Sequence, residues 1–406
     1  MHRKFTASVQ PVRVLMCAAL LAATMGVVTS ARAQQSEDQR LCSANTGVSR
    51  EQRLESCTAL IEAGLETPQN LAIAFNNRGD VHRAMRHYDR AIADYDQAID
   101  LDPDYAAAFK SRGIVHRALR DYDRAIADYD RAIAIDPKYA AAFNDRGNVH
   151  RDLRDYSRAV ADYDRAIELD PQYALAFNNR GNVHQARRDY DRAIADYDRA
   201  VELDPKYALA FSNRGNARQA LRDYDRAIVD YDRAIDLDPK YAAAFYGRGN
   251  AHRQKGRYDR AIQDYDHAIE IAPSYAAAFF ARGLAYQDKA RWDFEAYLNE
   301  GQYEALAIRD YDDAIRLNPK NAAAFNNRGN VYVSKRMYDR AMQEFDEAIR
   351  IDPNDALYYK NRGDVFRIIG QYQRAIADYR KALSLKIDGP IKKQIERAFK
   401  DLGVTD

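Results

Sequence analysis

The stretch from Asp121 to Ile133, DYDRAIADYDRAI, concentrates side chains that could do chemistry. Four aspartates, two arginines and two tyrosines fall within thirteen residues, and the stretch returns with one change at 189–201 and 223–235. Paired carboxylates serve as general acid and base in many hydrolases. A catalytic carboxyl needs an environment unlike that of its neighbours, whereas here the same environment recurs along the chain. We therefore do not expect a carboxylate active site.

A row of histidines suggests a second chemistry. Its members share one place in a 34-residue period, at which Arg218 interrupts the row: His82, His116, His150, His184 and His252. Neutral imidazole is a common metal ligand, so histidines from adjacent copies could hold a metal ion. Later copies carry Tyr286, Tyr332 and Phe366 at this place. These aromatic replacements favour the alternative that each imidazole packs as a flat ring between helices, and we predict neither a metal nor a cofactor.

A fixed spacing indicates which elements position these residues. Prolines recur every 34 residues from 103 to 273, Pro319 follows 46 residues later, and Pro353 follows after a further 34. Nine Arg-Gly pairs, from Arg78-Gly79 to Arg362-Gly363, run beside them. Such a period is typical of stacked repeats. We number nine predicted repeats: 72–105, 106–139, 140–173, 174–207, 208–241, 242–275, 276–321, 322–355 and 356–389.

Each repeat is predicted to be a helix–turn–helix unit. Position 1 is the first residue of a repeat, which is Ala106 in repeat 2. Ala125, Ile126, Tyr129, Ala132 and Ile133 follow the i, i+3, i+4, i+7, i+8 spacing of one helical face. The proline at position 32 ends the second helix, because it lacks an N–H donor and clashes with the preceding turn. The fold class expected is all-α.

With these residues in register, the sequence resembles the tetratricopeptide repeat family. The family pattern places an aromatic residue, Gly, Ala, an aromatic residue and Pro where repeat 2 has Phe109, Gly113, Ala125, Tyr129 and Pro137. The resemblance covers residues 72–389 and implies an α-α superhelix whose first helices line a concave groove. Two departures are consistent: arginine replaces the family's leucine at position 7, and histidine replaces its tyrosine at position 11 in most early repeats.

Every repeat has an arginine at position 7 and an acidic residue at position 23. We predict a structural ladder of ion pairs between the two helices, with Arg112–Asp128, Arg146–Asp162, Arg180–Asp196 and Arg214–Asp230 among its members. The alternative is an array of guanidinium groups that binds anions. Asp121, Asp123 and Asp130 are expected on the solvated face, near Arg124 and Arg131.

Asparagines occupy positions 5, 6 and 9, which resemble the groove positions of the family. The candidate partner-binding residues are Asn76, Asn77, Asn144, Asn148, Asn178, Asn179, Asn182, Asn213, Asn216, Asn250, Asn326, Asn327 and Asn330. Amides that both donate and accept could pair with an extended peptide backbone. The alternative is that near-identical copies share these residues through duplication alone. The family's clamp for terminal carboxylates needs further cations, of which only Lys110 and Lys360 are present, so we do not expect it.

Repeat 7 carries twelve extra residues at 290–301, ARWDFEAYLNEG. We expect this insert to lengthen both helices of the repeat, with Gly301 in the turn. Its apolar residues lie outside the repeat register and are candidates for an interface: Trp292, Phe294, Tyr297 and Leu298. The alternative is that they pack on their own neighbours.

The two ends of the chain differ from the repeats. Residues 1–33 combine a basic start, an apolar run and an A-x-A site before Gln34, which is typical of a cleavable signal peptide. Residues 34–71 are predicted to form an N-terminal cap with a helix at 51–63 and a Cys42–Cys57 disulfide. Residues 390–406 are predicted to form a capping helix and tail. We therefore expect an exported protein of bacterial type, periplasmic or secreted, without a stable membrane anchor.

Composition and motifs argue against nucleic-acid binding and against several classes of enzyme. Sixty-two basic residues balance 61 acidic ones, so there is no basic excess for nucleic acid. We find no P-loop, nucleophile elbow, dinucleotide fingerprint or H-E-x-x-H motif. The prediction is a non-enzymatic scaffold that binds a protein or an extended peptide. The alternative is a structural subunit of an envelope assembly or a polysaccharide export complex. The sequence predicts neither the partner nor the oligomeric state.

Overall fold

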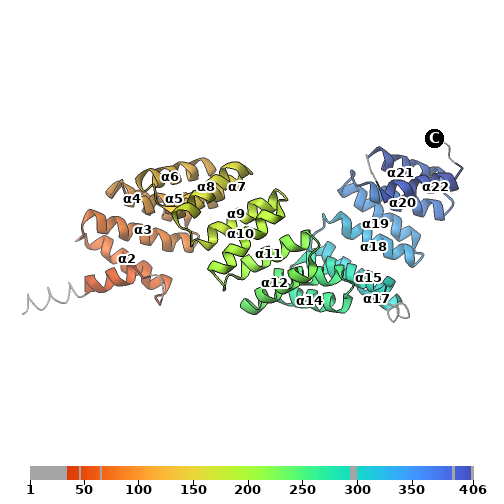
Figure 1. Ribbon diagram of the computed structural model, residues 1–406, viewed down its shortest axis with the longest axis horizontal. Coiled ribbons are helices and arrows are strands. Elements are labelled where there is room, and N and C mark those ends of the chain that lie inside the picture. Colours follow the sequence, from red (N-terminus) through yellow and green to blue (C-terminus); the bar gives the residue numbers. More distant parts are fainter. Residues whose placement is uncertain (1–33, 45–46, 65, 293–299, 386–388, 404–406) are drawn as a thin grey trace, which may run out of the picture. The chain divides into compact units, whose positions relative to one another are not determined.

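A computed structural model describes residues 34–406, apart from 45–46, 65, 293–299, 386–388 and 404–406. Helices and short turns account for nearly all of the described chain, which contains no β-strand (Figure 1). The fold is therefore all-α, as predicted. The chain divides into two compact units, residues 1–183 and 184–406, with the boundary inside one helix. The signal peptide predicted at 1–33 lies outside the described residues.

Unit 1 contains an N-terminal cap and helix pairs of the predicted repeats. Residues 34–42 are helical, and the elements that follow are α2 Arg50–Ala63, α3 Pro68–Ala84, α4 Tyr88–Leu101, α5 Ala106–Ala118, α6 Tyr122–Ile135, α7 Ala140–Asp152, α8 Tyr156–Leu169 and α9 Ala174–Ala186. The two helices of a repeat pack against each other, as α5 does against α6, and α6 also packs against α7 of the next repeat. Helix α3 begins one turn before the predicted boundary at residue 72.

Unit 2 continues the same pattern. Its helices are α10 Tyr190–Leu203, α11 Ala208–Ala220, α12 Tyr224–Leu237, α13 Ala242–Gln254, α14 Tyr258–Ile271, α15 Ala276–Trp292, α17 Glu300–Leu317, α18 Ala322–Ser334, α19 Tyr338–Ile351, α20 Ala356–Ile368, α21 Tyr372–Ser384 and α22 Pro390–Asp401. First helices of successive repeats also contact one another, as α13 does with α15 and α15 with α18. Each helix pair therefore depends on its neighbours for burial, which is the arrangement of an α-solenoid.

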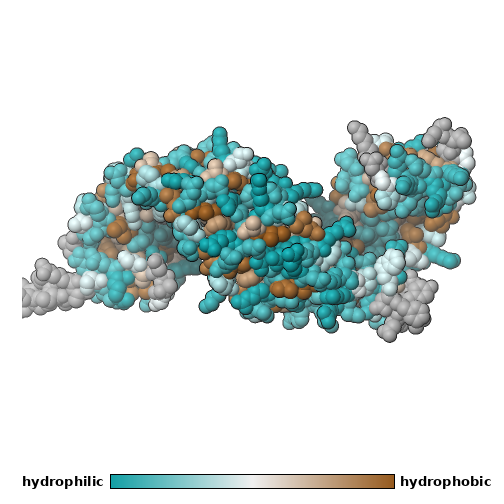
Figure 2. Space-filling view, viewed as in Figure 1, coloured by the Kyte–Doolittle hydropathy of each residue, from teal (hydrophilic) through white to brown (hydrophobic). Residues whose placement is uncertain are grey.

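Small residues and one large ring form the core of each repeat. In repeat 2, Ala125, Tyr129 and Ala132 on α6 are fully buried. A β-carbon added to Gly113 on α5 would lie 2.9 Å from the Tyr129 ring, so glycine at position 8 gives the ring its space. Elsewhere hydrophobic residues are interspersed among hydrophilic ones on the face that Figure 2 shows. The core of the repeats is thus built mainly from alanine and tyrosine.

Two residues mark the boundaries of the second helix in repeats 2 to 5. In these repeats an aspartate at position 16 is the N-cap of the second helix; the Asp121 carboxylate, for example, accepts a hydrogen bond from the backbone N–H of Arg124 at 3.2 Å. Such a cap satisfies an N–H group that the helix leaves without a partner. At the other end, α6 stops at Ile135, two residues before Pro137. Asp121 is therefore solvated, as expected, and also initiates a helix.

Arginines in left-handed backbone conformation connect the two helices of most repeats. Arg86, Arg120, Arg154, Arg188, Arg222 and Arg336, all at position 15, have φ between 57° and 62°. Repeats 6 and 9 have Gly256 and Gly370 there, also at positive φ. A side chain with a β-carbon is strained in this region, whereas glycine is not.

We expect the Arg120→Gly substitution to stabilise unit 1 by up to about 1 kcal/mol, because glycine relieves the strain at φ 62°. Urea unfolding followed by circular dichroism measures the change. The same replacement inside α6, Arg124→Gly, is the control and should instead destabilise by about 1 kcal/mol. Equal effects of the two substitutions would contradict the assignment of strain to Arg120.

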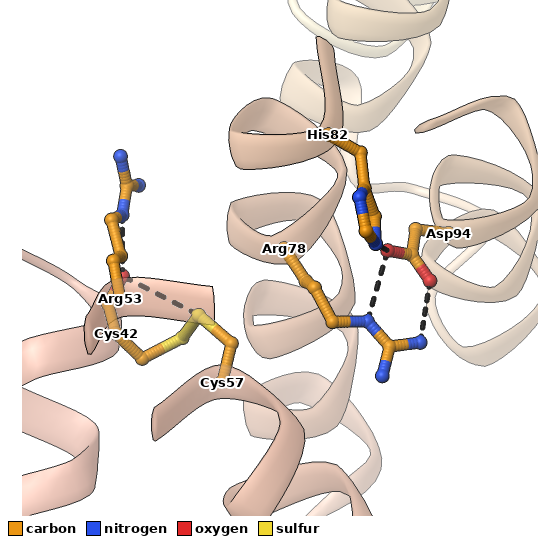
Figure 3. Close-up of a disulfide and its surroundings, with 6 residues drawn as sticks. All are labelled: Cys42, Arg53, Cys57, Arg78, His82 and Asp94. Carbon is orange, nitrogen blue, oxygen red and sulfur yellow. Dashed lines mark hydrogen bonds and ion pairs between the residues drawn. A yellow bond between two sulfur atoms is a disulfide. The ribbon is translucent and has the colours of Figure 1, made fainter. Parts of the chain in front are cut away.

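Each unit contains one of the two predicted caps. Ile395, Ala398 and Phe399 of α22 are buried against the last repeat. In the N-terminal cap, the sulfur atoms of Cys42 and Cys57 lie 2.06 Å apart, and the Arg53 side chain donates to the Cys42 carbonyl oxygen (Figure 3). Both cysteines pack with Leu60 and with Ala74 of α3. This cap is therefore joined to the first repeat through a small apolar cluster.

The insert of repeat 7 lengthens both helices, as expected. Helices α15 and α17 have 17 and 18 residues, where α13 and α14 have 13 and 14. Gly301 does not lie in the turn, which was the expectation, but in the first turn of α17. Nothing lies within 4 Å of a β-carbon added to Gly301, so packing does not require glycine there.

Candidate functional site

The position-7 arginines lie beside the position-23 acids. In repeat 3, the Arg146 guanidinium on α7 donates from Nε and Nη2 to the two oxygens of Asp162 on α8, at 3.0 and 2.6 Å. Asp162 is buried, and two parallel bonds make the pair bidentate. Equivalent pairs are Arg78–Asp94, Arg112–Asp128, Arg214–Asp230, Arg248–Asp264, Arg282–Asp310, Arg328–Glu344 and Arg362–Asp378. Of the remaining predicted pair, Arg180 lies in unit 1 and Asp196 in unit 2.

A second carboxylate contacts the same arginines. The Nη1 group of Arg146 donates to Asp130 of repeat 2 at 2.6 Å. Our placement of Asp130 on the solvated face beside Arg131 was therefore incomplete, because the packing of α6 on α7 brings Asp130 against the arginine of the next repeat. Its side chain stays 53% exposed. Equivalent contacts are Arg112–Asp96, Arg180–Asp164, Arg214–Asp198, Arg248–Asp232, Arg282–Asp266, Arg328–Asp312 and Arg362–Asp346.

Position 25 explains a difference in the last repeat. Repeats 1 to 8 carry an aspartate there, whereas repeat 9 carries Arg380. Helix α22, rather than the first helix of another repeat, packs against repeat 9, so no position-7 arginine there needs a carboxylate. Each ladder arginine also lies over the aromatic ring at position 4, as Arg146 does over Phe143 at 5.4 Å. Two carboxylates and a ring therefore surround the guanidinium, which favours a structural ladder over an anion-binding array.

Burial affects the acids of the ladder. It raises the pKa of Asp230, Asp264 and Asp310 above the ordinary value, although the arginine beside each carboxylate opposes this effect. Burial also raises the pKa of Glu344, the glutamate of repeat 8. The arginines thus offset a desolvation cost that their partners would otherwise bear in full.

The histidines of the row lie above the ladder carboxylates. In repeat 1, Nε2 of His82 lies 3.9 Å from a carboxylate oxygen of Asp94, which Arg78 holds from the other side (Figure 3). The corresponding distances are 3.7 Å for His116 and His150 and 3.8 Å for His184. All five histidines are buried. Burial lowers the pKa of His82, His116, His150 and His252. In repeat 5, Arg218 takes this place and donates to Asp230.

The position-5 asparagines do not line an open groove as we expected. Asn144 is fully buried, and its side-chain oxygen accepts a hydrogen bond from the side-chain amide of Asn179 in the next repeat at 2.9 Å. Asn326 accepts in the same way from Asn361 at 2.8 Å. These amides connect neighbouring first helices, which explains why asparagine recurs at positions 5 and 6. Asn76 and Asn178 are buried as well.

Several position-9 asparagines bind a tyrosine of their own repeat. The hydroxyl at position 24 donates to the side-chain oxygen in the pairs Tyr163–Asn148, Tyr231–Asn216 and Tyr265–Asn250, at 2.7 to 3.0 Å. Repeat 2 has Ile114 at position 9, and there the buried Tyr129 hydroxyl has no partner in the described structure. These asparagines therefore support the core, and sequence reasoning missed their tyrosine partners.

Other candidates lie at the surface of the first helices. Asn182 and Asn213 are half-buried. Asn77 is half-buried and lines a small pocket with Ile73 and Asn70 beside the N-terminal cap. Asn327 donates from its amide to the Ala323 carbonyl at 2.8 Å, which leaves its side-chain oxygen available.

Asn330 differs from the other position-9 asparagines. Repeat 8 has Phe345 at position 24, so no hydroxyl reaches Asn330. Its side chain makes no hydrogen bond to the part of the chain that the structure describes, and it is half-buried. It lines an open cavity of about 660 Å³ between α15, α18 and α20, which we call the repeat 7–9 pocket. This amide is therefore both unpaired and accessible.

Apolar and charged residues share the repeat 7–9 pocket. Its apolar wall consists of Leu284, Ala290, Val331 and Val333. Charged residues of the lining are Asp288, Arg291, Glu304, Lys360 and Asp364. A volume of several hundred Å³ with an apolar wall and a few polar groups is common in ligand-binding sites. The pocket occupies first-helix positions of three successive repeats, which are the positions expected to line the groove.

The two lysines that match the family's carboxylate clamp, Lys110 and Lys360, have contacts of their own. Lys360 donates to Asp364 of its own helix at 2.8 Å, and Nζ of Lys110 lies over the Tyr139 ring at 5.7 Å. They lie in different units. The structure gives no support for a clamp around these two lysines.

The insert contributes to one side of the pocket. Arg291 lines it, and the Arg291 guanidinium lies 5.9 Å from the centre of the Trp292 ring. Trp292 is 70% exposed. The other interface candidates, Phe294, Tyr297 and Leu298, lie outside the described residues.

Within the described ranges, no group of three histidine, cysteine, aspartate or glutamate side chains is placed so that it could hold a metal ion. No helix there is long and apolar enough to span a bilayer.

Comparison with known proteins identifies a repeated sequence family. A family model described as "Tetratricopeptide repeat" matches residues 76–140, 144–208, 212–276 and 294–356. A second model with the same description matches residues 344–377. Together these matches cover more than half of the chain. No curated protein matches the sequence.

Solved structures show partial similarity. The crystal structure of YrrB, described as a tetratricopeptide repeat protein with an unusual peptide-binding site, is 24% identical; the match covers 49% of this chain and 97% of YrrB, with a TM-score of 0.39. MamA is 25% identical over 41% of this chain and 96% of its own, with a TM-score of 0.37. PilF of Pseudomonas aeruginosa is 18% identical over 51% and 95%, with a TM-score of 0.47.

Proposed function

Because the chain belongs to the tetratricopeptide repeat family, we propose that it is a non-enzymatic scaffold that binds a protein or an extended peptide. The observation that carries this proposal is the unpaired amide of Asn330 in the repeat 7–9 pocket. An amide offers one group that donates and one that accepts, which suits a peptide unit of a partner. Leu284, Val331 and Val333 supply an apolar wall beside it.

The pocket replaces the longer row of asparagines as the proposed contact surface. Asn144 is bonded to Asn179, and Asn326 is bonded to Asn361. Asn148, Asn216 and Asn250 accept hydrogen bonds from tyrosines. Substituting them would remove core hydrogen bonds, so their loss would not report on binding alone. Asn330 avoids this ambiguity.

We expect Asn330→Ala to weaken peptide binding about tenfold or more and to leave stability within about 0.5 kcal/mol, because the amide has no described partner. The probe is a peptide selected from a random display library on the wild-type protein, with affinity measured by calorimetry. The matched control is Asn250→Ala, at the same repeat position but outside the pocket. It should bind normally and lose about 1–2 kcal/mol of stability, since the Tyr265 hydroxyl loses its acceptor. If no peptide is selected, or if Asn330→Ala binds as wild type does, the proposed contact surface is wrong.

We also propose that the mature protein is exported, to the periplasm or beyond the cell. Support comes from the signal-like residues 1–33 and from the proximity of Cys42 and Cys57, since disulfides persist in oxidising compartments. In the native host, we expect the intact mass to correspond to a chain that begins at Gln34. Alkylation should modify the cysteines only after reduction. An unprocessed chain with free thiols would refute export.

A further inference from the structure

The charges that line the repeat 7–9 pocket are unequally paired. Asp288 accepts from Arg253 at 2.7 Å, and Glu304 accepts from Ser334 and Lys335. Asp364 accepts from the Tyr379 hydroxyl at 2.7 Å and from Lys360 at 2.8 Å. Each acid of the lining thus has a cation of this chain beside it. The negative charge of these carboxylates is therefore largely neutralised within the protein.

Arg291 has no such partner. It is exposed, and no carboxylate of the described ranges forms an ion pair with its guanidinium. Its one described contact is with the Trp292 ring, which is itself 70% exposed. A guanidinium that lies against an aromatic ring keeps its N–H groups free for a bidentate acid. Arg291 is thus the group of the lining that can still neutralise a negative charge.

Three features of the pocket limit what can bind there. Arg291 favours a carboxylate, the wall of Leu284, Val331 and Val333 favours an apolar side chain, and Asn330 favours a backbone amide. In an extended chain successive side chains point to opposite sides. A single peptide segment can therefore present an acidic residue to one side and an apolar residue to the other, with its backbone between them.

We propose that the repeat 7–9 pocket recognises an extended segment of a partner protein that carries an aspartate or glutamate next to an apolar residue. The acidic side chain pairs with Arg291, and Trp292 covers the segment at the rim. Aromatic and arginine side chains of this kind dominate many protein interfaces. This inference rests on the proposed scaffold function and adds the chemistry of the partner.

Selection from a random peptide library on wild-type protein and on Arg291→Glu tests the proposal. We expect acidic residues to be enriched on the wild type and basic residues on Arg291→Glu. A peptide selected on the wild type should lose about tenfold or more in affinity when its acid becomes the amide, and again on Arg291→Glu. Arg316→Glu, an exposed charge reversal on α17, is the control and should select the same peptides as wild type.

The outcomes separate this inference from the proposed function. Peptides that need Asn330 but show no acidic preference would overturn the inference and leave the scaffold function intact. Absence of any peptide that depends on Asn330 would overturn both. If amidation of the peptide's C-terminus abolishes binding, the recognised acid is a chain end, and the proposal of an internal acidic side chain is wrong. Self-association of the wild-type protein that Arg291→Glu abolishes would identify a second copy as the occupant and would also overturn it.

Discussion

We expect Arg146→Leu to lower the free energy of unfolding by about 3–5 kcal/mol. The substitution leaves Asp162 buried without the guanidinium that donates to both of its oxygens. It also removes the ion pair with Asp130, which connects repeat 2 to repeat 3. An unpaired buried carboxylate is far more costly than the net gain from the intact pair. Few single substitutions in this chain should have a larger effect.

Hydrogen exchange of the α7 and α8 amides is the appropriate measurement, because repeats in a solenoid can unfold separately. The matched control is Arg158→Leu in the same repeat, where the side chain is 74% exposed and bonds the exposed Asp155. Its effect should stay below about 1 kcal/mol. The double variant Arg146→Leu with Asp162→Leu should recover part of the loss. Protection equal to that of wild type in Arg146→Leu would contradict the structural role of the ladder.

We expect acid sensitivity to be the second large effect. Burial lowers the pKa of His82, His116, His150 and His252 in the folded chain. Between the folded value and the ordinary value of about 6.5, the unfolded chain binds more protons, so the free energy of unfolding falls as the pH drops below about 6.5. Four sites contribute in the same direction. Each kcal/mol lost lowers the Tm by roughly 2–4 °C.

The later repeats supply the variant that tests this effect. Replacing the four histidines with phenylalanine, as Phe366 stands in repeat 9, removes the titrating groups and keeps a flat ring. Its Tm should change less than that of wild type between about pH 8 and about pH 5.5. The ladder acids act in the other direction, because the raised pKa of Asp230 and Asp264 favours the folded state on protonation. That contribution is complete below the ordinary value of 3.8 and is lost as the pH rises through the raised pKa of the folded state, and it is common to both proteins. If the Tm of the two proteins depends on pH in the same way, the histidines are not the cause of the acid sensitivity.

The sequence predicted the parts of the structure that depend on one repeat at a time. Arg112 and Asp128 recur together at fixed positions, and antiparallel helices bring them together. Asp130 also recurs, but its partner Arg146 belongs to the next repeat, so the contact depends on how α6 packs against α7. The replacement of this aspartate by Arg380 in the final repeat is the signal that could have revealed it.

The candidate site was harder to predict than the fold. Asn144 and Asn330 occupy positions that look equally suited to a groove in sequence. The structure buries Asn144 against Asn179 of the next repeat. Asn330 has no such partner, because repeat 8 carries Phe345, which lacks a hydroxyl, where other repeats carry a tyrosine. Arg291 lies outside the repeat register, so only the lengthened α15 shows that it borders the pocket.

Most ladder arginines contact an acid of their own repeat and an acid of the preceding one. This arrangement affects which gains and losses of repeats the gene can tolerate. A segment of 34 residues that is lost or duplicated within the array brings an arginine and an aspartate to every new junction, so the chain keeps its joints. A copy appended after the last one would instead place its arginine against Arg380. Growth and shrinkage by recombination are thus permitted in the interior of the array and opposed at its carboxyl end.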